Sequence, residues 1–136
     1  MPGPNYGLDK GFTVTGSAAY AFGECVVQGS TNTSCARATT AGSLVLGVCQ
    51  ENLLDTTKVT TGKPVVAVRI LGITRCIAGG AIARGAKLQN DVNARAVALA
   101  QTAGGTAPKP VFGIALSPAS ANGDMIDVLL TPGAMF

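Results

Sequence analysis

Apolar and polar residues alternate in short segments separated by turns rich in glycine or asparagine, and this pattern predicts β-strands. The clearest strand is Val65–Ile70 (VVAVRI), after which Gly72 predicts a bulge or kink, and Phe12–Thr15 (FTVT) and Ile126–Leu130 (IDVLL) alternate in the same way. No stretch of about ten residues keeps the helical period. Ala94–Gln101 has helical propensity, but its alternation after an Asn/Asp turn favours a strand. We therefore predict an all-β fold.

The strand pattern occurs twice along the chain. Gly80–Gln89 (GAIARGAKLQ) aligns with Ala18–Val27 (AAYAFGECVV), and Gly85 then falls on Gly23. Each copy continues with a polar turn, an apolar segment that contains a glycine, and an alternating strand. The two glycine-containing segments are Leu44–Cys49 and Val111–Leu116. We predict one small β-barrel or β-clip-like domain that is built from two degenerate half-repeats closing on each other.

The first eleven residues differ in composition from the rest of the chain. Met1–Gly11 (MPGPNYGLDKG) contains two prolines and three glycines, which disfavour regular structure. We predict an extended N-terminal arm over residues 1–11 and a single β domain over residues 12–136. The arm is either a disordered tail or a segment that packs across a neighbouring subunit. In the second case, the expected anchoring residues are Tyr6, Leu8 and Phe12.

Composition limits the classes of function. Apolar residues make up 47% of the 136 residues, whereas charged residues make up 12% and aromatic residues 4%. Such a chain buries a core of small side chains and leaves a weakly charged surface, as is typical of proteins partly covered by other subunits. The ten basic residues are spread along the chain, so we expect no nucleic-acid-binding patch. We also expect neither a membrane span nor a signal peptide, and hence synthesis in the cytoplasm.

The sequence offers little catalytic or metal-binding chemistry. It contains no histidine, which excludes a Ser-His-Asp triad and the common histidine-containing metal sites. Four cysteines are present: Cys25, Cys35, Cys49 and Cys76. Because no two of them have CxxC spacing, we expect buried thiols rather than a zinc site or disulfides. Asp91 and Asp124 lie in turn sequences and are expected to cap backbone amides. We predict no catalytic residue, no cofactor, no metal and no enzymatic activity.

The order of the motifs in the second half resembles that of the tailed-phage head decoration proteins, also called capsid cement proteins. The motifs are Ala81–Leu88 (AIARGAKL), Val111–Leu116 (VFGIAL) and Asn122–Leu130 (NGDMIDVLL). The resemblance covers about residues 12–131. It rests on the order of these motifs along the chain, since each motif is a turn or strand of glycine and small apolar residues.

The resemblance implies a structural protein of the virion. It implies binding to the outer surface of a phage head, where the protein stabilises contacts between major capsid subunits. The implied partners are the major capsid protein and further copies of the same chain, with a homotrimer favoured over a dimer. The alternative is a β-clip-type module that binds a carbohydrate or another polymer. Two tyrosines and no tryptophan are few aromatic residues for a sugar site.

Overall fold

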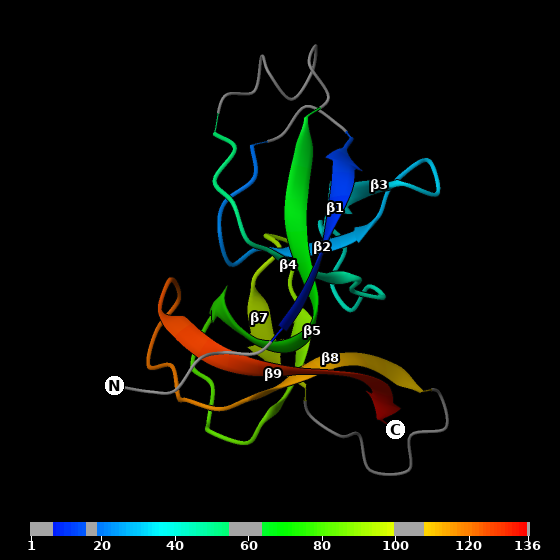
Figure 1. Ribbon diagram of the computed structural model, residues 1–136. Coiled ribbons are helices and arrows are strands. Elements are labelled where there is room, and N and C mark those ends of the chain that lie inside the picture. Colours follow the sequence, from blue (N-terminus) through cyan, green and yellow to red (C-terminus); the bar gives the residue numbers. More distant parts are fainter. Residues whose placement is uncertain (1–6, 16–18, 55–63, 100–107, 136) are drawn as a thin grey trace.

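The computed structural model describes residues 7–15, 19–54, 64–99 and 108–135, and every regular element in these ranges is a β-strand (Figure 1). The strands are β1 Gly7–Val14, β2 Cys25–Gln28, β3 Ser34–Arg37, β4 Gly47–Cys49, β5 Val65–Ile77, β6 Lys87–Asn90, β7 Ala96–Ala98, β8 Lys109–Ala115 and β9 Met125–Met135. The predicted all-β fold is confirmed. The segment with helical propensity contributes β7, as its alternation predicted.

The strands form one sheet that partly closes on itself. Their order is β1-β3-β2-β4-β5-β9-β8-β6-β7, and β1 pairs with β5 as well as with β3. This second pairing closes the first five strands into a ring, with β1 antiparallel to β5 and parallel to β3. In the second half, Ala78 follows β5 directly and forms a parallel bridge to Ala96 of β7. β7, the last strand in the sheet order, therefore also lies beside the residue that follows β5.

The two halves repeat one hydrogen-bonding pattern, which confirms the predicted half-repeats. Gly23 and Gly85, 62 positions apart, have φ values of 88° and 87°, a conformation that side chains with a Cβ rarely adopt. The amide of Gly23 donates to the carbonyl oxygen of Cys49 at 2.9 Å, and the amide of Gly85 donates to that of Ala115 at 2.7 Å. Each half thus uses a glycine to turn the chain before its second strand.

Strand β5 belongs to both halves. Its N-terminal part pairs with β1, and its C-terminal part pairs with β9. The pair Phe12↔Val66 joins β1 to β5, and the corresponding pair Thr74↔Val128 joins β5 to β9. Each residue of the second pair lies 62 positions after its counterpart in the first pair. β5 is therefore the last strand of the first half and the first strand of the second. Figure 1 shows this strand running between the two halves.

The buried side chains form two clusters that follow the division into halves. The first-half cluster consists of Phe12, Val14, Tyr20, Val26, Cys35, Cys49, Val66 and Val68. The junction cluster contains buried residues of the second half together with Cys25, Ala38 and Val48. Six of the fifteen buried residues in the junction cluster are alanines, so this cluster is a core of small side chains, as the composition predicts.

The first strand begins earlier than the sequence predicts. Residues 7–11, which we expected to belong to the N-terminal arm, lie in β1, where Gly7 is opposite Gly72 and Gly11 is opposite Ala67 on β5. Pairing with β5 supplies the hydrogen-bond partners that make this glycine-containing segment a strand. The boundary between arm and domain therefore has to be placed before Gly7, and residues 1–6 lie outside the described residues.

Candidate interaction surface

Two leucines form an exposed apolar pair on β1 and β5. Leu8 and Leu71 are register partners across the two strands and are 53% and 51% exposed. The register shifts between Leu8 and Asp9, so that Ile70 is an extra residue on β5. Gly72 follows with a φ of 96°. The kink predicted at Gly72 and the neighbouring bulge thus lie beside the leucine pair.

An ion pair fixes the backbone next to these leucines. Nε of Arg69 donates to Oδ1 of Asp9 at 2.8 Å, and Nη2 donates to Oδ2 at 3.3 Å. Nη1 of the same arginine donates to the carbonyl oxygen of Ile73 at 2.8 Å. Gly7 leaves space for the guanidinium, because a Cβ at this position would lie 2.6 Å from Nε. These contacts join β1 to β5 and hold Leu8 on an ordered strand.

An apolar groove of about 300 Å³ lies between segments of the two halves. Its lining residues are Gln28 from β2, Leu44, Val45 and Leu46 from the segment before β4, and Pro132 from β9. Val45 packs against the junction cluster and Leu46 against the first-half cluster. Leu44, in contrast, is 79% exposed. The segment is therefore anchored by two side chains and presents the third to solvent.

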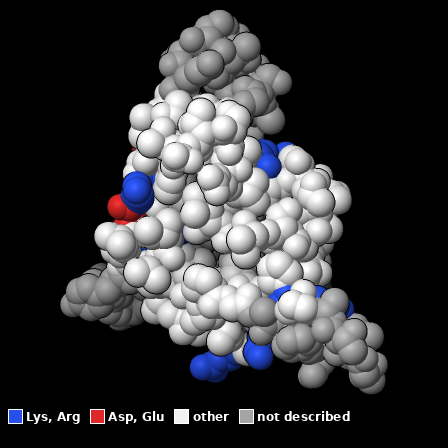
Figure 2. All heavy atoms as spheres, turned by 90° about the vertical axis from the view of Figure 1, so that its right-hand side faces the viewer, with Lys and Arg blue, Asp and Glu red and all other residues white. Residues whose placement is uncertain are grey.

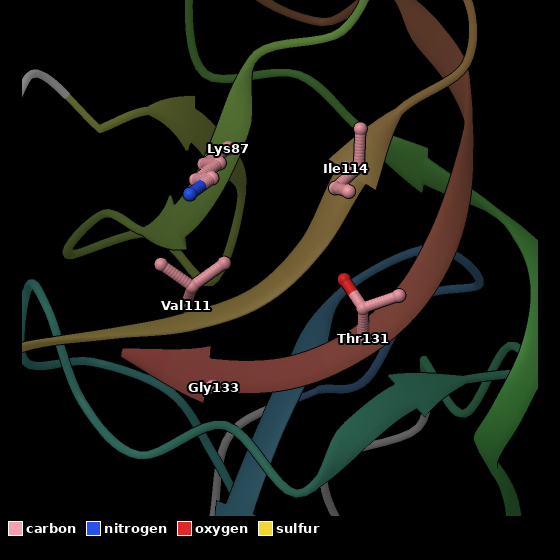
Figure 3. A pocket seen from close by; sticks show the side chains of 5 residues that line it. All are labelled: Lys87, Val111, Ile114, Thr131 and Gly133. Atoms are coloured by element: carbon pink, nitrogen blue, oxygen red, sulfur yellow. The ribbon is translucent and has the colours of Figure 1, made fainter. Parts of the chain in front are cut away.

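A smaller hollow of about 180 Å³ lies over β6, β8 and β9. Its lining residues are Lys87, Val111, Ile114, Thr131 and Gly133, and Figure 3 shows that they come from three neighbouring strands. The polar side-chain groups in this lining are one ammonium group and one hydroxyl group. They can donate hydrogen bonds, but the described residues of the lining include no carboxylate, imidazole or thiol for acid–base chemistry.

The face shown in Figure 2 is almost uncharged, with lysine and arginine side chains at its margin. Within the described ranges, no group of three or more His, Cys, Asp or Glu side chains is arranged to hold a metal ion. No helix that could span a membrane occurs in this part of the chain. The features suited to contact with another molecule are thus the exposed apolar side chains.

The structure places the three predicted anchoring residues differently. Tyr6 lies outside the described residues, and Leu8 is exposed on β1. Phe12 is only 7% exposed and belongs to the first-half cluster, with the Lys10 ammonium 5.6 Å from its ring centroid. Its side chain therefore packs within its own chain and is not presented to a neighbour.

The sequence did not single out Leu44, Leu71 or Pro132. Leu44 begins one of the two glycine-containing apolar segments of the repeat, and Leu71 directly follows the best alternating strand. The bulge at Ile70 and the groove arise from strand pairing, which a local pattern does not reveal. Gly72 was the one local signal of an irregularity in this region.

The expected capping by the two turn carboxylates and the expected burial of the four cysteines are confirmed. Oδ1 of Asp91 accepts hydrogen bonds from the amides of Asn93 and Arg95 at 2.8 and 2.9 Å. Oδ2 of Asp124 accepts from the amides of Ser120 and Ala121, and these hydrogen bonds lower the pKa of Asp124. All four cysteines are buried and free.

No protein-family model matches the sequence, and no curated protein matches it. Among solved structures, the fold is similar to the crystal structure of the head fiber gp8.5 N base in bacteriophage phi29, with a TM-score of 0.62. The match covers 91% of this chain and 93% of that chain at 14% sequence identity. At this identity, the similarity concerns the fold.

Proposed function

We propose that this chain is a structural protein of a bacteriophage head, bound to the outer surface of the head and stabilising contacts between major capsid subunits. The observation that carries the proposal is the fold similarity to a phage head fiber base, which extends over 91% of this chain and 93% of that one. Such coverage means that the whole architecture is shared rather than a single hairpin. The sequence motifs Ala81–Leu88 and Val111–Leu116 favour the same class of protein.

The described surface supports a role in assembly. Leu8, Leu44 and Leu71 expose large parts of their side chains on a molecule with few charges. Covering apolar surface stabilises a complex by about 25 cal/mol per Å² removed from water, before the costs of association. Many copies on a closed shell also make weak individual contacts effective. A weakly charged protein with scattered leucines is suited to this kind of binding.

In this proposal, the partners are the major capsid protein and further copies of the chain, with a trimer favoured over a dimer. On the head, the pair of Leu8 and Leu71 contacts a neighbouring subunit, so that this contact contributes to head binding. Synthesis takes place in the host cytoplasm, and the protein is carried on the virion. The proposal involves no reaction, cofactor, nucleic acid or membrane.

The carbohydrate-binding alternative gains no support from the described aromatic side chains. Sugar sites commonly use exposed aromatic rings as stacking surfaces. Phe12, Tyr20 and Phe112 are all buried. Phe22 is of intermediate exposure in the turn before β2.

Co-sedimentation tests the proposed function directly. Purified protein is mixed with expanded, undecorated heads of the phage that encodes it, and the bound copies are counted per head. We expect saturation at a fixed ratio of copies to major capsid subunits. Absence of binding at micromolar protein concentration would contradict the proposal.

Two matched surface variants locate the contact. Leu8→Glu, or the same change at Leu71, places a carboxylate in the apolar pair and should weaken binding to heads about tenfold or more. Val92→Glu is the control, because Val92 is 58% exposed but lies in the turn between β6 and β7. Equal binding by Leu8→Glu and Val92→Glu would show that the leucine pair is not the contact, while leaving head binding itself intact.

A further inference from the structure

Two cysteine thiols touch inside the core where the halves meet. The Sγ atoms of Cys25 and Cys76 are 3.9 Å apart, and both side chains are fully buried. Cys25 opens β2 of the first half, whereas Cys76 lies in the part of β5 that pairs with β9 of the second half. The Cys76 thiol also donates to the carbonyl oxygen of Gly23 at 3.1 Å. The contact thus connects strands that lie 51 positions apart in the sequence.

We infer that Cys25 and Cys76 are a latent disulfide pair, and that oxidation of the pair links the two halves covalently. A disulfide has an S–S distance of about 2 Å, so the sulfurs have to approach each other by roughly 2 Å. They are already in van der Waals contact, and each sulfur can move by rotation about its own Cα–Cβ bond. Six of the fifteen buried residues in the junction cluster, to which both cysteines belong, are alanines.

Hydrogen peroxide is an oxidant small enough to reach buried thiols when the structure opens locally. One cysteine sulfur attacks a peroxide oxygen, which forms a sulfenic acid and releases one water molecule. The second sulfur then attacks the sulfenic sulfur, the S–S bond forms and a second water molecule leaves. The two thiols together lose two electrons and two protons, and the peroxide is reduced to two water molecules.

The local chemistry makes this oxidation slow at neutral pH. The hydrogen bond with Cys76, followed by burial, raises the pKa of the Cys25 thiol well above its usual value. Little thiolate is therefore present near pH 7, and thiolate is the reactive form. We expect the pair to remain reduced in a reducing cytoplasm and to oxidise faster as the pH rises toward about 9.

The other two cysteines provide an internal comparison. Cys35 and Cys49 are buried in the first-half cluster, and the Cys49 thiol donates to the carbonyl oxygen of Glu51 at 3.2 Å. In the described part of the chain, Cys25 and Cys76 form the one thiol–thiol contact within hydrogen-bonding range. A specific reaction should therefore join Cys25 to Cys76 and leave Cys35 and Cys49 as thiols.

Peptide mapping of oxidised, folded protein tests the inference. The full chain is treated with hydrogen peroxide at about pH 7 and about pH 9, its remaining thiols are alkylated in denaturant, and it is digested without reduction. Cleavage after lysine and arginine places Cys76 on residues 76–84 and both Cys25 and Cys35 on residues 11–37. The Cys35→Ala variant removes this ambiguity. We expect a cross-linked pair of these peptides in both proteins, and its disappearance after reduction.

Thermal unfolding gives a second readout. A cross-link between residues 25 and 76 restricts the unfolded chain, and the oxidised protein should melt about 5 °C or more above the reduced protein. Cys76→Ala should lose this difference, whereas Cys35→Ala should keep it. If Cys35→Ala fails to fold, fragmentation of the cross-linked wild-type peptides decides the question, because it shows whether Cys25 or Cys35 carries the alkyl group. Recovery of Cys25 and Cys76 on separate peptides from folded protein oxidised at pH 9, or a cross-link to Cys35 or Cys49, would overturn the inference.

Discussion

At the scale of single residues, two strand glycines are required by the close approach of a neighbouring backbone. A Cβ at Gly47 in β4 would lie 2.3 Å from the carbonyl oxygen of Arg69, and a Cβ at Gly113 in β8 would lie 2.7 Å from that of Leu129. Backbone atoms cannot move aside as the end of a flexible side chain can. Close packing against the neighbouring strand thus explains why each apolar segment of the repeat contains a glycine.

Replacing Gly47 by alanine should therefore destabilise the protein. We expect Gly47→Ala to lower the free energy of unfolding by about 2 to 4 kcal/mol, measured by urea unfolding. Gly80→Ala is the control, because a Cβ at Gly80 meets no atom within 4 Å and its φ is not positive. This control should change the free energy of unfolding by less than about 1 kcal/mol. Equal stability of the two variants would contradict the packing argument.

Buried acidic groups make the protein sensitive to alkali. Burial raises the pKa of the Cys35 thiol from 9.0 to about 11 and that of Tyr20 from 10.0 to about 12. The unfolded chain then loses these protons at lower pH than the folded chain. The contribution of these two groups to the free energy of unfolding is complete below about pH 9 and is lost as the pH rises through about 12. It amounts to about 2 kcal/mol for each group.

Urea unfolding at about pH 8 and about pH 11 measures this loss, and we expect a clearly lower free energy of unfolding at the higher pH. Tyr20→Phe removes the titrating hydroxyl group and its 2.8 Å hydrogen bond to the carbonyl oxygen of Thr15. The variant should be less stable at pH 8 but should lose less stability between pH 10 and 12. An unchanged pH dependence would show that Tyr20 does not contribute to it.

At the scale of elements, β1 is needed to close the first ring, and its N-terminal residues take part. Deleting residues 1–6 leaves all described β1–β5 pairs in place, so the melting temperature should stay within about 2 °C. Deleting residues 1–11 removes the pairs from Gly7 to Gly11 and the Asp9–Arg69 ion pair. We expect this deletion to lower the melting temperature by about 5 °C or more. Equal melting temperatures of the two deletions would mean that residues 7–11 contribute nothing to the fold.

Polar contacts between elements also join the halves. The fully buried Asn90 of β6 donates from Nδ2 to the carbonyl oxygen of Thr40 at 2.7 Å and accepts from the amide of Ser43 at 2.9 Å. Arg37 of β3 pairs with the buried Glu24 and donates to the carbonyl oxygen of Asn93 at 3.1 Å. Buried polar groups with these partners are costly to separate, so each half depends on the other.

At the scale of the whole molecule, the shared strand β5 and these contacts predict cooperative unfolding. Calorimetry should show a single thermal transition whose calorimetric and van't Hoff enthalpies agree. A fragment that ends before β5 loses the strand that closes its ring and should not fold alone. Two resolved transitions would indicate that the halves are independent domains.

Several features could be read from the sequence because they depend on local chemistry. Alternation at Val65–Ile70 and β-branched side chains predicted strands, since successive side chains of a strand point to opposite faces. The alignment of Gly23 with Gly85 predicted the half-repeats, because positive φ selects glycine at each copy of a turn. Asp91 and Asp124 were predicted to cap turns because their short side chains reach nearby amides.

Only the tertiary structure decided which distant segments meet. Pairing with β5 made residues 7–11 a strand, folding of the first half buried Phe12, and the bulge at Ile70 left Leu71 exposed beside Leu8. The contact of Cys25 with Cys76 likewise depends on how the two halves pack. The sequence by itself determined the strands, turns and duplication, because these follow from neighbouring residues. Strand partners and burial were decided by the fold, because they depend on residues far apart along the chain.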